Sequence, residues 1–136
     1  MKSLLVLTLS LFFFLPTGHT KVTTDYSDDF IVDFLRHSPE FATVKKQNRD
    51  LFKKAKYLGA EITRTPMADG LLSYEVNLQF STEVVYRGKK HAVPMSLIAH
   101  THIERYIVPN RRIVASKLSD PVFQKPQTPA LSGPND

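Results

Sequence analysis

The stretch from Leu71 to Tyr86 alternates apolar and polar residues more regularly than any other part of the chain. One set, which is mostly apolar, comprises Leu72, Tyr74, Val76, Leu78, Phe80, Thr82, Val84 and Tyr86. The residues between them include Ser73, Glu75, Asn77, Gln79 and Ser81. Successive side chains of a β-strand point to opposite faces of the sheet. The pattern therefore predicts a long strand with one buried face and one wet face, as in an antiparallel sheet.

Further strands are expected on both sides of this one. They cover residues 57–65, residues 92 to about 106, and residues 112–118. In the first of them, Leu58, Ala60 and Ile62 share one side, and Asp69-Gly70 closes the turn that follows. Pro94 predicts an edge position or a bulge near the start of the third strand, because proline cannot donate a ladder hydrogen bond. The sequence thus predicts about four antiparallel strands.

Two helices are expected before the strands. The first begins near Thr24 or Asp25, and its apolar residues recur at helical spacing. Ser38 is a typical N-cap for the second, which runs from Pro39 to about Lys54. Helices that precede a meander predict an α+β domain, with N-terminal helices packed on a curved antiparallel sheet of about four strands. By analogy, such a domain is similar to the cystatin-like and nuclear-transport-factor-like cone folds.

The two ends of the chain differ from the middle. Lys2 precedes an apolar run from Leu4 to Leu15, which is too short to cross a bilayer and is typical of a secretory signal peptide. We expect a signal peptide over residues 1–20, a single domain over 21–119 and a flexible, proline-rich tail over 120–136. The protein is then periplasmic or secreted, and it is anchored in the inner membrane only if the leader is retained. The chain has no cysteine, so its core must be stable without disulfides.

The formal net charge is +5, and the basic residues cluster in two places. The first cluster comprises Lys45, Lys46, Arg49, Lys53, Lys54 and Lys56, and the second comprises Arg87, Lys89 and Lys90. Basic patches attract nucleic acid, anionic lipid or acidic proteins. An exported protein rarely meets nucleic acid, and the first cluster is interleaved with apolar residues at helical spacing. We therefore interpret it as a solvated helix face and expect no nucleic-acid partner.

One motif of the chain could bind a metal. His100, His102 and Glu104 are spaced by two residues, so on a strand all three side chains share one face. Zinc accepts histidine nitrogen and carboxylate oxygen, but a site needs further ligands, and no spacing singles out Glu75, Gln79 or Glu83 as one. The motif is weak on its own.

The other face of the same strand carries Leu97, Ala99 and Ile103, which identifies that face as the core side. The histidines then belong to a polar sheet face, and we assign no metal site and no cofactor. The expected interface residues are His100, His102, Glu104, Glu75, Asn77 and Gln79.

Signatures of catalysis and of protease inhibition are weak. The chain has no cysteine, no nucleophile-elbow serine and no glycine-rich phosphate loop. Asp28 and Asp29 are adjacent at a helix start, where carboxylates act as capping groups. The stretch from Glu83 to Gly88 is the nearest match to a cystatin inhibitory loop, but it has Glu for Gln and one extra residue. The sequence predicts that the protein is not an enzyme.

The region from about Asp33 to Phe123 resembles the periplasmic domain of the IcmL/DotI family, inner-membrane components of type IVB secretion systems. The resemblance rests on Phe34-Leu35 and Ser38 after a short helix, a Val44-Lys45-Lys46 region, the strand from Gly70 to Leu78, the stretch Val84-Val85-Tyr86, and Arg105 in a long strand. Members have a cytoplasmic segment and a full transmembrane helix, whereas this chain has only the signal-like run.

The resemblance implies a non-enzymatic component or accessory of a type IVB secretion or conjugation apparatus, with protein partners from that complex. Homo-oligomerisation stays open. The alternatives are a ligand- or metal-binding cone-fold protein that uses the face with His100, His102 and Glu104, and a secreted cystatin-like inhibitor.

Overall fold

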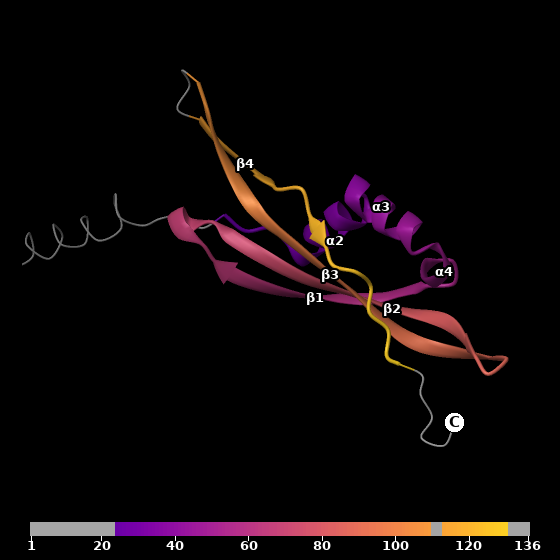
Figure 1. The fold of residues 1–136 in the computed structure, drawn as a ribbon. Coiled ribbons are helices and arrows are strands. Elements are labelled where there is room, and N and C mark those ends of the chain that lie inside the picture. Colours follow the sequence, from indigo (N-terminus) through magenta and orange to yellow (C-terminus); the bar gives the residue numbers. More distant parts are fainter. Residues whose placement is uncertain (1–23, 110–112, 131–136) are drawn as a thin grey trace, which may run out of the picture.

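The computed structural model describes residues 24–109 and 113–130, and it contains helices followed by an antiparallel sheet (Figure 1). The helices are α2 (Asp28–Arg36), α3 (Pro39–Gln47) and α4 (Arg49–Phe52), and a 3-10 turn, η1, covers Ala68–Gly70. The strands are β1 (Lys56–Pro66), β2 (Leu72–Tyr86), β3 (Lys89–Val108), β4 (Ile113–Leu118) and β5 (Val122–Phe123). The predicted α+β class is confirmed. The predicted signal peptide lies outside the described residues, and no described helix is long and apolar enough to cross a membrane.

Side-chain caps set the starts of the first two helices. The Ser27 hydroxyl accepts a hydrogen bond from the backbone N–H of Phe30, so α2 begins at Asp28 rather than at Thr24 or Asp25. The Ser38 hydroxyl accepts from the N–H of Phe41, which confirms the predicted cap of α3.

The second predicted helix is interrupted. It was expected to continue to about Lys54, but Asn48 leaves the helical region at φ −123° and ψ 44° and separates α3 from α4. Its side-chain amide donates to the carbonyl of Val44, which occupies an acceptor near the end of α3. Asparagine competes for the backbone in this way, and the helix therefore breaks here.

The strands form one meander in the order β1-β2-β3-β4, and β5 also pairs with β3. Tight turns join them where the backbone takes positive φ: Asp69 (64°) and Gly70 (72°) precede β2, and Arg87 (55°) and Gly88 (75°) join β2 to β3. Pro94 lies near the start of β3, in a part of that strand that pairs with β2 alone among the described residues, as the edge prediction requires.

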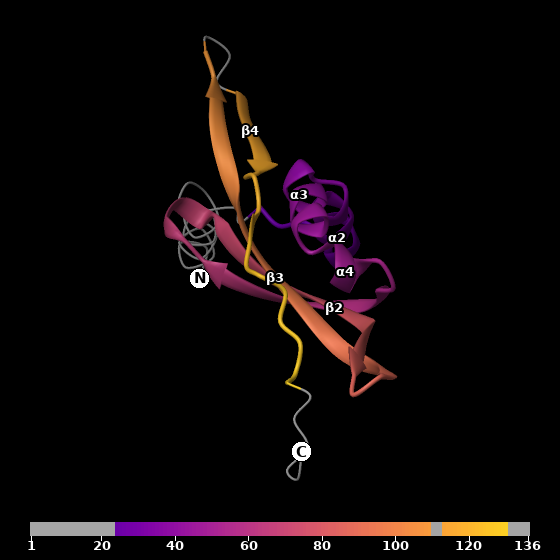
Figure 2. The ribbon, with the colours of Figure 1, turned by 45° about the vertical axis from the view of Figure 1, so that its right-hand side comes forward.

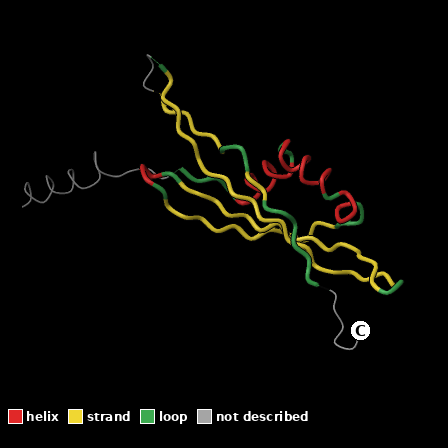
Figure 3. Tube along the Cα trace, in the orientation of Figure 1, coloured by secondary structure: helices red, strands yellow, loops and turns green. Residues whose placement is uncertain are grey.

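All three helices lie on one side of the sheet, and the two ends of β3 extend past them (Figures 2 and 3). The core fills the space between the helices and the sheet. Its fully buried residues are Ile31, Leu35, Tyr74, Val76, Leu78, Leu97, Ala99 and Ile103. The alternation in β2 therefore predicted the buried face correctly, because burial here follows the two-residue period of the strand.

The prediction that Leu58 shares a side with Ala60 and Ile62 is wrong. The register shifts between Tyr57 and Gly59, so Tyr57 takes the inward position and the Leu58 side chain is 63% exposed. A bulge of this kind adds a residue to one strand and reverses the side to which the preceding residues point.

The prediction of a flexible tail from residue 120 differs from the structure over residues 120–130. Val122 and Phe123 pair with β3, and Gln127 exchanges two backbone hydrogen bonds of 2.9 Å with Ser96. The ring of Phe123 lies 5.7 Å from that of Phe41, and Pro121 and Pro126 are buried. The prolines need no ladder partner, because Gln124 and Gln127 supply the N–H donors that this segment uses. Residues 131–136 lie outside the described part of the chain.

Candidate binding face of the sheet

The sheet has an outer face that the helices do not cover (Figure 2). Residues directly opposite each other in an antiparallel pair share a face, and the register of β2 and β3 pairs Glu75 with His100, Asn77 with Ile98 and Gln79 with Ser96. His102 and Glu104 continue the same face along β3 because they keep the two-residue spacing. The structure thus brings the six predicted interface residues to one face. Their side chains point away from the core, as predicted.

The two histidines contact different partners. His100 lies 3.9 Å from a carboxylate oxygen of Glu75, and its Nε2 is 3.0 Å from the side-chain nitrogen of Gln124. His102 Nδ1 lies 3.0 Å from the Ser119 hydroxyl, and its Nε2 is 3.8 Å from Glu104. The second carboxylate oxygen of Glu104 accepts a hydrogen bond from the Tyr106 hydroxyl.

This arrangement does not gather ligands around one point. Within residues 24–109 and 113–130, no group of three or more His, Asp or Glu side chains is placed to hold a metal ion. The His100 and His102 rings are tied to Gln124 and Ser119, which follow β4 in the sequence. The polar contacts of the face therefore hold the C-terminal segment against β3.

A groove of about 530 Å³ lies farther along the sheet, toward the start of β3. Its walls come from β1, β2, β3 and the C-terminal segment, and they comprise Leu58, Asn77, Gln79, Phe80, Pro94, Met95, Ser96, Gln127, Thr128 and Pro129. None of these residues is charged. The side-chain oxygen of Asn77 is buried and has no hydrogen-bond partner among the described residues. Because an unpaired buried polar atom is costly, a donor brought by a bound molecule would stabilise the groove.

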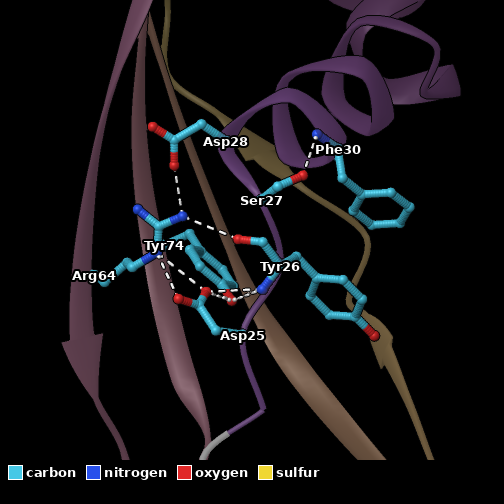
Figure 4. Close-up of polar contacts among 7 residues, drawn as sticks. All are labelled: Asp25, Tyr26, Ser27, Asp28, Phe30, Arg64 and Tyr74. Atoms are coloured by element: carbon cyan, nitrogen blue, oxygen red, sulfur yellow. Dashed lines mark hydrogen bonds and ion pairs between the residues drawn. The ribbon is translucent and has the colours of Figure 1, made fainter.

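A second polar cluster, which we call the Arg64 network, was not predicted. It lies at the start of α2 and joins Arg64 of β1 and Tyr74 of β2 to Asp25, Tyr26 and Asp28 (Figure 4). Arg64 donates to Asp25 at 3.0 Å, to Asp28 at 2.6 Å and to the backbone carbonyl of Tyr26 at 3.0 Å. The Tyr74 hydroxyl donates to Asp25 at 2.8 Å. The network fixes the segment before α2 to the sheet.

The Arg64 network changes the acidity of its members. Burial and the hydrogen bond to Asp25 raise the pKa of Tyr74 to about 12. Partial burial alone would raise the pKa of Asp25, but the hydrogen bonds from Tyr74, Arg64 and the Tyr26 N–H, with the charge of Arg64, hold it below its ordinary value. The two carboxylates likewise raise the pKa of Arg64, chiefly through the hydrogen bond to Asp28. These shifts favour the charged forms of Asp25 and Arg64 and the neutral form of Tyr74. In these forms the hydrogen bonds between them hold the segment before α2 on the sheet.

One sequence signal could have indicated this network. Arg64 shares the parity of Ala60 and Ile62, so it is a charged residue on the inward side of β1. An inward charge needs a partner. The partners Asp25 and Asp28 lie 39 and 36 residues earlier in the chain, so spacing alone could not identify them.

Comparisons of this chain with protein-family models, with curated proteins and with solved structures find no match.

Proposed function

We propose that this chain is an exported, non-enzymatic domain that binds another protein through the outer face of its sheet. The observation that carries the proposal is the uncharged groove lined by Asn77 and Gln79, where the Asn77 oxygen lacks a donor. A partner segment with apolar side chains and backbone N–H groups would fill the groove and pair that oxygen. Of the six predicted interface residues, Asn77 and Gln79 line the groove itself.

The partner class that we propose is a component of a type IVB secretion or conjugation apparatus. The support for this class is the sequence pattern shared with IcmL/DotI periplasmic domains, together with the signal-like run at residues 4–15. Export places the domain in the compartment where such an apparatus presents its protein surfaces.

A site-specific photo-crosslinker tests both parts of the proposal. We would replace Gln79, which lines the groove, with a photoreactive residue in cells that express such an apparatus, and identify the adducts by mass spectrometry. The matched control carries the same residue at Lys46, which is exposed on α3 on the other side of the sheet. We expect adducts with an envelope secretion protein from position 79 and none from position 46. Equal labelling from both positions, or a free monomer without adducts, would contradict the proposal.

A small neutral ligand is the second candidate for the groove. The volume of about 530 Å³ lies within the range of small-molecule sites, and the lining combines apolar carbons with amide groups. Native mass spectrometry of the purified full chain tests it. A bound species that disappears when Asn77→Leu removes the amide from the groove, but stays in Ser73→Ala, would favour a ligand over a protein partner.

A further inference from the structure

A second groove lies on the opposite side of the sheet, between α2 and the edge strand β1. Its volume is about 380 Å³. Its lining comprises Asp28, Asp29, Val32, Asp33 and Arg36 of α2 together with Tyr57, Ala60 and Ile62 of β1. The floor is therefore apolar and the helix side is mostly acidic.

The groove exists because the helices cover the middle of the sheet better than its edge. Ala60 and Ile62 pair with Leu78 and Val76, which are fully buried. Ala60 and Ile62 themselves are only partly buried, although they share the inward face. The inward side of β1 thus leaves apolar surface that no described element covers.

The backbone of β1 is also open on one side. It pairs with β2 over the length of the strand, and no described strand pairs with its other edge. An edge strand presents a row of unpaired N–H and C=O groups, which can accept an extended segment as a further strand. The free edge and the apolar floor adjoin each other, so one extended segment could use both.

The charges on α2 indicate which segment would fit. Asp29 and Asp33 are one helical turn apart on the side that lines the groove. The Asp29 carboxylate makes no ion pair with any described residue, and Asp33 has only an exposed contact of 3.2 Å with His37. Arg36, which also lines the groove, lies 4.2 Å over the ring of Tyr57. The whole chain has a net charge of +5, but Asp29 and Asp33 make this side of the groove acidic. The negative charge there favours a cationic segment.

We propose that a partner polypeptide adds an extended basic segment as a strand along the free edge of β1. Every second side chain of that segment points to the helix side of the sheet. Among these inward side chains, an apolar one covers Ala60 and Ile62, and lysine or arginine side chains reach Asp29 and Asp33. The site is separate from the outer face, so it can be occupied whether or not the outer groove binds a partner.

A synthetic peptide of about eight residues, with lysine and valine in turn at every second position and threonine between them, tests the proposal with the full chain. We expect saturable binding by calorimetry and slower amide hydrogen exchange in β1, because the edge N–H groups acquire partners. The double variant Asp29→Asn, Asp33→Asn should bind the peptide about tenfold more weakly.

The matched control is Asp50→Asn, Asp120→Asn, which makes the same change in net charge at exposed positions outside the groove. It should bind the peptide as the unchanged chain does. The proposal is overturned if both double variants weaken binding equally, or if the same peptide with glutamate in place of lysine binds as well. It is also overturned if the amide hydrogens of β1 exchange more slowly at high protein concentration without peptide. That result would show that the free edge of β1 pairs with a second copy of this chain.

Discussion

The histidine face and the Arg64 network contain similar residue types but differ in how closely they are connected. His100 and His102 lie 3.9 and 3.8 Å from their carboxylate neighbours, and their side chains are more than 40% exposed. Arg64 lies 3.0 and 2.6 Å from two carboxylates, and its side chain is 29% exposed. The Cα atoms of residues two apart on a strand are separated by about 7 Å, and within the motif His102 and Glu104 come no closer than 3.8 Å. Contacts from other elements decide which polar cluster is tight.

The largest effect should come from the centre of the Arg64 network. Arg64→Ala removes the hydrogen bonds to Asp25, Asp28 and the Tyr26 carbonyl, and we expect the free energy of unfolding to fall by about 2 kcal/mol. Urea denaturation measures it. Arg64→Lys keeps the charge but cannot bridge three acceptors, so its loss should be smaller. Equal losses in the two variants would show that the charge alone contributes nothing, and no loss in Arg64→Lys would show that the geometry of the guanidinium is unimportant.

A smaller effect is expected from the hydroxyl of Tyr74. Tyr74→Phe keeps the buried ring but removes the donor to Asp25, and it should lower the free energy of unfolding by about 1 kcal/mol. The control Tyr57→Phe removes a hydroxyl from a partly exposed ring of β1 and should change stability less. If the two losses are equal, the Asp25 contact does not stabilise the fold.

Sequence reasoning predicted the parts of the fold that local periodicity controls. Alternation placed Tyr74, Val76 and Leu78 in the core, and the same parity placed His100 and His102 on the outer face. It failed where a single residue broke the period, at the bulge before Gly59 and at Asn48 between α3 and α4. The break at Asn48 is local, because its side-chain amide bonds to the carbonyl of Val44, whereas the bulge is defined by the pairing of β1 with β2.

The candidate site could be predicted only in part for the same reason. Parity identified Asn77 and Gln79 as outer-face residues, but the groove beside them also needs Leu58 and the segment at 127–129. That segment looked like a tail because it is rich in proline, and only its backbone pairing with Ser96 of β3 makes it a wall. Proline content indicates only a local conformational propensity, whereas this wall depends on a contact with residues far away in the sequence.

The pH dependence of the free energy of unfolding should also distinguish the Arg64 network from the histidine face, with a smaller effect than the substitutions above. The pKa of Asp25 is lower in the folded chain than its ordinary value of 3.8, so the unfolded chain binds a proton first as the pH falls. The stabilisation is complete above that ordinary value and is lost as the pH falls through the lowered pKa. Urea denaturation between pH 6 and about pH 2 should show this loss, and Asp25→Asn should show less of it. An unchanged acid dependence in Asp25→Asn would assign the loss to other carboxylates.

The smallest effect on stability is expected on the histidine face. The double variant His100→Ala, His102→Ala loses the side-chain contacts with Gln124 and Ser119. The Ser119 hydroxyl still accepts a hydrogen bond from the backbone N–H of residue 102, and it lies 3.2 Å from the Thr101 hydroxyl. We expect the free energy of unfolding to change by less than about 1 kcal/mol, because each position is half exposed. A chelator should leave the melting temperature of the unchanged chain where it was. Stoichiometric zinc that is present in the native protein and absent from the double variant would reverse this ranking. The histidine face would then be the more strongly stabilised of the two regions.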